Sequence, residues 1–339
     1  MDDSFAMIEW QEITKYNHFA LNDTMSENFD LYQSWEWGEF KKIHSWNPVR
    51  IGGYDNFGNL ICTVQIVEKK IGGVFHMLWI IGHPIIHRNC SNKLLNNILQ
   101  SLISKIDSMY KFYYLRLYSN KNITSQESYL FHKYLKKAII PINSSFTFLL
   151  DLNVPDDIWM ARLRKKHRYY LRNAEKSNIV WKFGISNNLI LDFVSLHNEM
   201  AKEKKESFGY SYEAYALLTK LLNTRTRILI GYYDSEPIAG CYVLKDGDIC
   251  YYMSAATNKK GKALNASYSM IYYLKKKSAD MNVSKLDLGG IAPGVSKSIG
   301  VDHFKMGFGG EIVNQLGEWE HGNGFARILG NFLVWLRIK

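Results

Sequence analysis

The stretch Lys285–Glu311, with the sequence KLDLGGIAPGVSKSIGVDHFKMGFGGE, predicts how the second half of the chain is organised. It places a short apolar strand at 285–288 before two glycines, then a polar loop, the pair Phe304-Lys305 and a second run of glycines. Glycine at the end of a strand allows positive φ and a close approach of another group to the backbone. Such a strand and loop indicate a ligand site beside Lys305, although a lysine-bearing surface turn would give the same pattern.

Length and composition indicate a globular protein of two domains. At 339 residues the chain exceeds one ordinary core, and its 47% of hydrophobic residues can fill two. Lys and Arg outnumber Asp and Glu by 42 to 32, a net charge of +10. This excess favours an anionic partner, which the charge alone leaves open among RNA, a phosphorylated metabolite and an acidic membrane surface.

The cysteines and the N-terminus indicate a reduced, intracellular setting. Cys62, Cys90, Cys241 and Cys250 form no CxxC pair, and no histidine stands at ligand spacing, so we expect reduced thiols and no metal site. The first residues, MDDSFAMIEW, lack the apolar core of a signal peptide, and the longest apolar run, 74–86, is too short to span a bilayer. We therefore expect a cytoplasmic protein, with peripheral contact at the inner membrane face left open.

The hydrophobic pattern predicts two α/β domains with mixed sheets. The first carries a helix at 31–43, hairpin strands at 49–53 and 60–68, a strand at 74–81, a helix at 93–109 and a strand at 112–117. The second carries a strand at 146–152, a basic helix, helices at 189–204 and 212–222, strands at 227–233, 237–245 and 249–255, a helix at 263–279 and the strand at 285–288. This second order is similar to that of a GNAT-type acyltransferase domain.

A run of cations between 162 and 182 predicts a helix with a broad basic face. It contains Arg162, Arg164, Lys165, Lys166, Arg168, Arg172, Lys176 and Lys182 against the single acid Glu175. Residues three and four apart share a helix face, and a histidine and two tyrosines stand among the cations, a mixture that suits phosphates with stacked bases. We assign Lys165, Lys166, Arg168 and Arg172 to tRNA or phosphate binding, with a solvated face as the alternative.

Three stretches resemble the Fem-type (FemABX) aminoacyltransferases, which build the peptide cross-bridges of bacterial peptidoglycan. They are QSWEWGEFK at 33–41, KKHRYYLRNAEK at 165–176, and DLGGI followed by FKMGFGGE within the 285–311 stretch. The resemblance implies two tandem GNAT-like domains whose sheets face a shared cleft. It places the first domain at 1–145, the second at 146–318, and the segment 319–339 back against the first.

The resemblance also implies roles for three residues. Phe304-Lys305 matches the pair that meets the aminoacyl end of tRNA, where Lys305 would stabilise the charge of the transition state. Lys41 matches the lysine that contacts the phosphates of the UDP-linked or lipid-linked peptide precursor. We therefore expect aminoacyl-tRNA as the co-substrate, no cofactor, and an amine of a peptidoglycan precursor or of another cell-envelope or small molecule as the acceptor.

Five further positions are candidates for binding the substrate. Gly289 and Gly290 follow the predicted strand, and Tyr215 and Tyr252 match tyrosines that line the family's cleft, although tyrosines at such positions also serve as core residues. Tyr210 stands where the family has an arginine that shares the phosphate contact. This departure puts the muramyl precursor itself in doubt.

The residues favour direct acyl transfer. The chain shows no Ser/His/Asp or Cys/His constellation, no HExxH, no GK[ST] loop and no GxGxxG that opens a helix after a strand. What remains is an amine attacking an activated ester or thioester, where a cation can stabilise the oxyanion. The sequence leaves three candidates for the group that accepts the proton of the attacking amine: Asp287, Asp302 and His303.

Two alternatives compete with tRNA-dependent transfer. The stretch Asn258–Ala263, NKKGKA, is similar to the pyrophosphate loop of GNAT enzymes, which would make the donor acetyl-CoA or another acyl-CoA and the acceptor an amino sugar or other amine. A non-catalytic RNA-binding protein would use the basic helix alone. The tail at 324–339 has the pattern of an amphipathic helix, which either packs on the first domain or lies on an anionic membrane, and we expect a monomer or a weak dimer.

Overall fold

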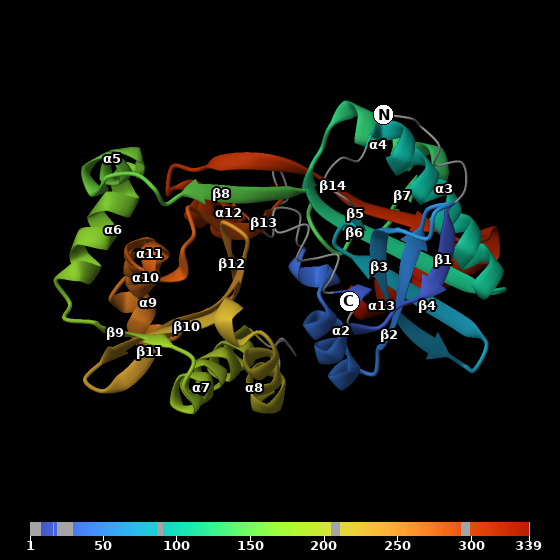
Figure 1. Cartoon of the computed structure of the whole chain (residues 1–339). Coiled ribbons are helices and arrows are strands. Elements are labelled where there is room, and N and C mark those ends of the chain that lie inside the picture. Colours follow the sequence, from blue (N-terminus) through green and yellow to red (C-terminus); the bar gives the residue numbers. More distant parts are fainter. Residues whose placement is uncertain are drawn as a thin grey trace. The chain divides into compact units, whose positions relative to one another are not determined.

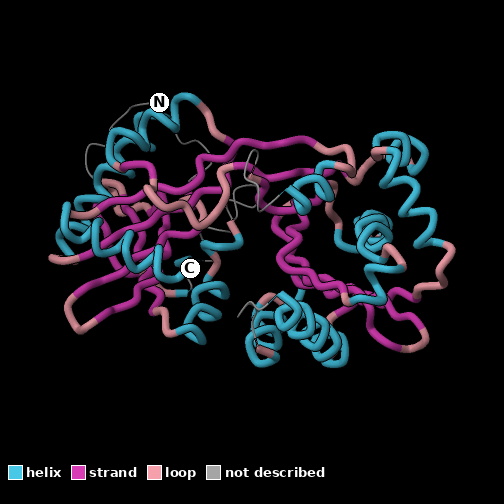
Figure 2. Tube along the Cα trace, turned by 180° about the vertical axis from the view of Figure 1, so that it is seen from behind, coloured by secondary structure: helices cyan, strands magenta, loops and turns pink. Residues whose placement is uncertain are grey.

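The computed structural model describes residues 8–15, 17–18, 30–86, 91–204, 211–292 and 299–338 (Figure 1). It divides into two compact units: unit 1 is Met1–Ser145 with Asn314–Lys339, and unit 2 is Phe146–Val313. The sequence predicts the same first boundary, after residue 145. It predicts that the chain passes back into the first unit at 319, whereas in the structure it does so at 314. Figure 2 shows strands at the centre of each unit with helices around them.

Unit 1 is built on a mixed sheet in the order β1-β2-β3-β4-β6-β14. These strands are β1 (Glu9–Glu12), β2 (Asn47–Tyr54), β3 (Leu60–Ile71), β4 (Phe75–Ile81), β6 (Tyr113–Asn122) and β14 (Glu311–His321), with β5 (Ile85–Ile86) paired to β3 and β7 (Lys136–Lys137) paired to β14. Strands β4 and β6 are parallel. The predicted hairpin between β2 and β3 is confirmed, since the Asp55 carboxylate accepts bonds from the N–H groups of Phe57 and Asn59 and so closes the turn.

Helices cover both faces of this sheet. On one face α3 (Asn92–Met109) and the unpredicted α4 (Ser125–Tyr134) pack on the side chains of alternate residues of β6, among them Leu115 and Leu117. On the other face lies α13 (Gly324–Ile338), which packs through Ala326 and Val334 on Tyr114 of β6. A Cβ on Gly330 would stand 2.2 Å from the Tyr114 ring, so glycine at this position lets the helix approach the sheet.

The front helix is shorter than expected and turned about its axis. We predicted one helix over 31–43 with Ile43 inward, whereas α2 spans Trp35–Lys41 between two 3₁₀ turns and Ile43 is 41% exposed. The extended backbone of Ser34 interrupts the helix, and its hydroxyl caps α2 by accepting a bond from Trp37 N–H at 3.1 Å. The helix therefore buries Trp37 and Phe40.

Unit 2 has a second mixed sheet, in the order β8-β13-β12-β11-β10-β9. Its strands are β8 (Phe146–Asp151), β13 (Lys285–Ile291), β12 (Ile249–Thr257), β11 (Glu236–Asp246), β10 (Thr226–Tyr233) and β9 (Val180–Gly184). The only parallel neighbours in this described sheet, β12 and β13, pair over three residues and stop at Tyr251 and Asp287. Beyond that point β12 continues beside β11, while β13 pairs with β8.

The helices of unit 2 also form two layers. Strand β11 sends Val243 towards the core that contains α6 (Lys165–Glu175) and α10 (Ala266–Lys276), and Tyr242 towards α7 (Asn187–Lys204) and α8 (Tyr212–Leu221). Figure 1 shows α7 and α8 on one side of β10 and β11, with α10 on the other. The remaining helices are α5 (Asp156–Arg162), α9 (Lys259–Ala263), α11 (Ser278–Met281) and α12 (Ile299–Met306).

Three expectations for unit 2 are wrong in detail. The basic stretch is two helices, because the chain is extended at Leu163 and Arg164, and Lys182 belongs to β9. The helix expected at 263–279 is divided into α9, α10 and α11, with Asn265 in a left-handed conformation (φ 57°) between the first two. The polar loop expected after the double glycine contains the helix α12.

Candidate active site

The double glycine bends β13 away from β12. Gly289 and Gly290 lie inside β13 rather than after it, and the pairing of β13 with β8 shifts register between Asp287 and Gly290. Gly289 has a φ of +78°, a conformation that L-residues with side chains avoid. The resulting bulge lies where β12 and β13 stop pairing, so backbone groups of β13 are no longer engaged by β12 there.

Lys305 of α12 reaches this bulge. Its Nζ atom donates a hydrogen bond to the carbonyl oxygen of Gly290 at 2.7 Å. A Cβ built on Gly289 would stand 3.8 Å from the same Nζ atom. An ammonium group carries three N–H donors. With one of them on Gly290, Lys305 can offer the others to an anionic atom.

Two buried carboxylates accompany this lysine. Burial lowers the pKa of Lys305 from its ordinary value, while the negative charges of Asp287 and Asp302 act in the opposite direction. Asp287 is 6% exposed, and burial raises its pKa. It accepts bonds from the Thr147 hydroxyl and from Gly289 N–H, and Asp302 accepts one from Ala292 N–H at 3.1 Å. Both carboxylates thus hold the local backbone while keeping the lysine charged.

Phe304, the residue before Lys305, faces a different neighbourhood. Its carbonyl oxygen lies 2.9 Å from His167 Nε2, and its ring makes edge-to-face contacts with Tyr268 and Phe308. A pocket of about 370 Å³ borders this ring. The pocket is formed by the first turn of α6, by Tyr268 of α10 and by α12, so Phe304 is shared between the pocket wall and the turn of helix that carries Lys305.

The four predicted phosphate-binding cations have different positions. Lys165 and Lys166 are exposed and line the pocket beside Phe304. Arg168 does not: its Nη1 donates to the carbonyl oxygens of Leu163, at 2.6 Å, and of Ala161, so it satisfies the end of α5. Its assignment to phosphate binding stays a prediction, which now concerns only the guanidinium nitrogens other than Nη1. Arg172 is exposed two turns further along α6 and is not among the residues that line the pocket.

Lys41 lies in unit 1, at the C-terminal end of α2. Its Nζ is 5.0 Å from the centroid of the Trp37 ring, a cation–π distance. Gln33 of the same front motif has a structural role, since its Nε2 donates to the carbonyl oxygen of Ile81 at 2.7 Å. Arg50, which no sequence motif indicates, stacks on this helix with its guanidinium carbon 3.7 Å from the centroid of the Trp35 ring.

Two of the tyrosines predicted to bind the substrate are buried or partly buried in the core of unit 2. Tyr215 is 2% exposed and packs against Phe193 and Tyr242 in the core, so the expectation that it lines a cleft is wrong for this conformation. Tyr252 of β12 is partly buried against the core of unit 2, and burial raises the pKa of its hydroxyl. Tyr210 lies outside the described residues.

The sequence of the loop at 258–263, which is similar to the pyrophosphate loop of GNAT enzymes, is explained by capping and packing within unit 2. The Asn258 side chain accepts a bond from Gly261 N–H at 2.9 Å, so it already caps the short helix α9. A Cβ on Gly261 would stand 2.3 Å from the carbonyl oxygen of Ile238, which explains the glycine by packing. Lys262 pairs with Glu203 at 2.8 Å.

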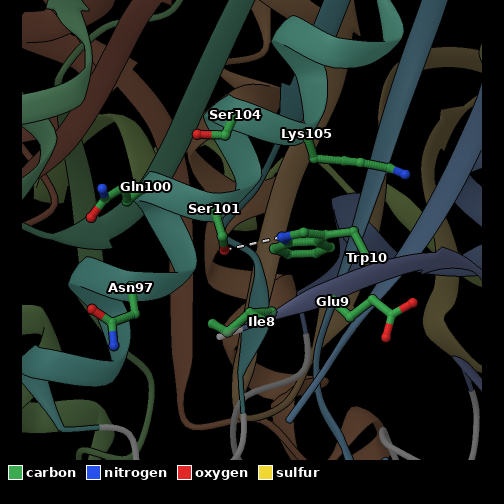
Figure 3. A pocket seen from close by; sticks show the side chains of 8 residues that line it. All are labelled: Ile8, Glu9, Trp10, Asn97, Gln100, Ser101, Ser104 and Lys105. Atoms are coloured by element: carbon green, nitrogen blue, oxygen red, sulfur yellow. Dashed lines mark hydrogen bonds between the residues drawn. The ribbon is translucent and has the colours of Figure 1, made fainter. Parts of the chain in front are cut away.

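A cavity larger than the pocket beside Phe304 lies in unit 1. It measures about 580 Å³ and lies between β1 and α3, where Trp10 Nε1 donates to Ser101 at 3.0 Å (Figure 3). Its lining holds amides and hydroxyls, with Glu9 and Lys105 as the charged residues. None of the residues predicted to bind substrate or tRNA lines it.

Neither a metal centre nor a membrane span is found in the part of the chain that the structure describes. No group of three His, Cys, Asp or Glu side chains there could hold a metal ion. No described helix is both long enough and apolar enough to cross a bilayer.

Comparisons with known proteins agree with the sequence resemblance. The model of the FemAB family matches residues 216–321, which run from α8 to the end of β14 and include Phe304-Lys305. No curated protein sequence matches the chain.

Solved structures share the fold over nearly the whole length. FemX aligns with a TM-score of 0.76 at 16% identity and covers 97% of this chain and 99% of its own. L-PGS from Bacillus licheniformis aligns at 0.57 and 14% identity, covering 97% and 99%. A tandem GNAT protein from the clavulanic acid biosynthesis pathway aligns at 0.56 and 9% identity, covering 94% and 99%.

The predicted α/β fold of GNAT-like units is therefore confirmed. The FemAB match, over residues 216–321, includes the glycine bulge and Lys305. This chain resembles the FemAB family over residues 216–321 and has a tandem GNAT-like fold.

Proposed function

We propose that this protein transfers an aminoacyl group from aminoacyl-tRNA to an amine of a peptidoglycan precursor or a related cell-envelope molecule. The observation that carries the proposal is the half-buried Lys305 ammonium, anchored on Gly290 beside two carboxylates, with Phe304 next to it on a basic pocket. An aminoacyl ester is already activated, so the reaction needs positioning and charge stabilisation and no further cofactor. Charged tRNA is a cytoplasmic molecule, which places the reaction in the cytoplasm.

The chemistry follows from one cation beside a reacting carbonyl. The nitrogen of the acceptor amine attacks the ester carbon, a C–N bond forms, and the carbonyl oxygen becomes an oxyanion. Lys305 donates an N–H to this oxygen, where a preorganised donor lowers the barrier. The C–O bond to the ribose then breaks, and the proton lost by the amine nitrogen ends on the ribose oxygen. The products are an amide and uncharged tRNA.

Asp287 and Asp302 set the protonation state of Lys305. Because burial alone lowers the pKa of the lysine, a neutral amine would form at lower pH without the two carboxylates. A neutral amine is a weaker donor to an oxyanion than an ammonium group is. The carboxylates therefore support catalysis through Lys305, and their own bonds to Thr147, Gly289 and Ala292 fix their positions.

A label-transfer experiment tests this function. Purified protein is incubated with a radiolabelled aminoacyl-tRNA or with radiolabelled acetyl-CoA, each with a panel of peptidoglycan-precursor and small-molecule amines. We expect label to move to an amine from the tRNA and not from the thioester. Transfer from acetyl-CoA alone would replace this proposal with the CoA-dependent alternative, and tRNA binding without transfer to any amine would favour an RNA-binding protein.

The exposed face of α13 supports a further part of the proposal, peripheral contact with an anionic membrane. Large apolar side chains recur along the outer face of this helix: Phe325, Ile328, Phe332, Trp335 and Leu336. Phe112 of unit 1 stacks on Phe325 and extends the apolar surface. Arg327 of α13 is paired with Glu320, so the helix presents an apolar face with a tryptophan, as an interfacial helix does, and the net charge of +10 favours anionic lipid.

Vesicle binding checks this contact. We expect the protein to sediment with phosphatidylglycerol vesicles and to lose at least about tenfold in partition when Phe332 and Trp335 are both changed to serine, because burying each such side chain stabilises by roughly 1.5–3 kcal/mol. The matched control changes Phe57 and Tyr129, which are exposed elsewhere in unit 1, to serine. Equal losses in both double variants, or a dimer that the Phe332/Trp335 variant abolishes, would contradict membrane contact.

A further inference from the structure

The outer edge of the sheet in unit 1 borders a groove. Strand β1 is the last strand of the described sheet on that side, and β2 is its neighbour in the sheet. The cavity of about 580 Å³ lies between β1 and α3, and Figure 3 shows Trp10 reaching from the strand towards the helix. An exposed sheet edge with a groove beside it can bind an extended peptide as an additional strand.

The backbone of β1 shows which of its groups point away from the sheet. Ile13 N–H donates to the carbonyl oxygen of Arg50 in β2 at 3.2 Å, and the pairing of β1 with β2 runs without a register shift. Residues of an antiparallel strand alternate between bonding the neighbouring strand and facing away from it. Gln11 therefore bonds β2 as Ile13 does. The N–H and C=O groups of Trp10 and Glu12 point outward, where no described strand pairs with them.

The helix wall of the groove is polar. The flank of α3 towards β1 is lined by amide, hydroxyl and ammonium side chains: Asn97, Gln100, Ser104 and Lys105. Ser101 accepts the indole N–H of Trp10 at 3.0 Å, which fixes the helix against the strand. Amide side chains carry both donors and acceptors, so this wall suits a polar, extended chain and not an apolar helix.

The exposed side chains of β1 indicate the charge of its partner. Glu9 and Glu12 are exposed at the two ends of the strand, and no described cation forms an ion pair with either. Opposite charges on facing residues of two strands stabilise a sheet, and like charges destabilise it. An added strand is therefore favoured when it carries cations three residues apart, one opposite each glutamate.

The same charges argue against two other occupants. If β1 of a second copy paired with β1 in antiparallel fashion about its centre, Glu9 of each copy would face Glu12 of the other. The residues that precede β1 in the sequence, MDDSFAM, contain two aspartates and neither lysine nor arginine. The edge therefore fits a basic segment of another protein better than it fits this chain.

We propose that the outer edge of β1 and the facing flank of α3 bind an extended, basic segment of a partner protein as an additional strand. The backbone of this segment bonds Trp10 and Glu12, and its cations lie opposite Glu9 and Glu12. Side chains on one face of the segment meet the polar flank of α3. The surface lies wholly in unit 1 and includes none of the residues assigned to acyl transfer, so it is a docking site in addition to the proposed reaction.

Synthetic peptides test the backbone pairing without altering the protein. The probe is a fluorescein-labelled peptide of alternating threonine and valine with two lysines three positions apart, and its binding to the full chain is followed by fluorescence anisotropy. Methylating the amide nitrogen of every second residue removes the N–H donors along one edge of the peptide and leaves the other edge intact. We expect one of the two methylated peptides to lose at least about tenfold in affinity and the other to bind like the parent peptide. Equal affinities of all three peptides, or no binding of the parent, would overturn the proposal.

Charge reversal in the protein tests the second element of recognition. Glu9→Lys with Glu12→Lys should weaken binding of the lysine peptide by about tenfold and strengthen binding of a peptide with glutamates in place of the lysines. The matched control makes the same change at Glu199 and Glu236, which are exposed in unit 2. Equal losses in the two double variants would mean that the peptide responds only to overall charge, which would overturn the proposal. Sedimentation analysis covers the remaining case, since a dimer that the lysine peptide dissociates would assign the edge to a second copy and overturn it as well.

Discussion

Replacing Lys305 by alanine is expected to lower the rate of aminoacyl transfer by about 10²–10³-fold, the loss seen when one donor to an oxyanion is removed. The alanine retains no N–H that could reach the carbonyl oxygen of the ester. Nothing else described at the bulge of β13 carries a cation, since Gly289, Gly290 and Asp287 supply backbone and carboxylate groups. The loss should therefore appear in the turnover number rather than in the affinity for tRNA.

Single-turnover transfer from a radiolabelled aminoacyl-tRNA measures this effect, with tRNA affinity determined separately. The matched control is Lys285→Ala, an exposed lysine at the start of the same strand, which should keep full activity. Circular dichroism should show both variants folded. A Lys305→Ala protein that turns over at the normal rate would remove the catalytic assignment.

The pH dependence supplies an independent readout of the same residue. Because burial lowers the pKa of Lys305, its ammonium form is lost as pH rises through that lowered value. The oxyanion then loses its cationic donor, so the transfer rate should begin to fall at a pH below the pKa of an ordinary lysine side chain. This alkaline decline should be absent from the residual activity of Lys305→Ala.

The local part of this site could be predicted from the sequence. A strand followed by two glycines indicated a backbone that opens towards another group, and the structure shows the bulge at Gly289 with Lys305 Nζ bonded to Gly290. The helix α12 was missed because its eight residues lie between glycine-rich segments, which locally favour a loop. This helix positions the site, because it directs Phe304 towards the pocket and Lys305 towards the bulge of β13.

The basic stretch shows what local pattern cannot provide. Its spacing predicts one continuous helix, but Arg164 N–H bonds to the carbonyl oxygen of Gly307, and a Cβ on Gly309 would stand 2.5 Å from the oxygen of Arg162. These contacts join segments about 140 residues apart in the chain. They break the helix between α5 and α6, and the break in turn assigns Arg168 to the end of α5.

The pocket could not be predicted for the same reason. Tyr170, Tyr268 and Phe304 come from three separate segments, and only the packing of α6, α10 and α12 places them together. His167 was visible in the sequence among the cations. Its contact with the carbonyl oxygen of Phe304 is visible only when α12 is in place.

Reversing the charges of Lys165 and Lys166 together, to glutamate, is expected to weaken binding of tRNA by about 10- to 100-fold at moderate salt. Both side chains are exposed at the first turn of α6, and no described carboxylate pairs with either. Each cation removed from a phosphate lowers the slope of log affinity against log salt by roughly 0.7–0.9, and the added negative charges repel the same phosphates. Glutamate is favourable at the start of a helix, so the fold should tolerate the change.

The comparison that decides the point is a second double variant at the C-terminal end of the same helix, with Lys176 as its C-cap residue. Arg172→Glu with Lys176→Glu makes the same change in charge at exposed positions that do not line the pocket. If tRNA binds at the start of α6, the Lys165/Lys166 variant should lose much more affinity and salt dependence than this control in filter-binding titrations from low to high salt. Equal losses would mean that the helix attracts RNA only through its overall charge, and unchanged affinity in both would return the basic stretch to a solvated surface.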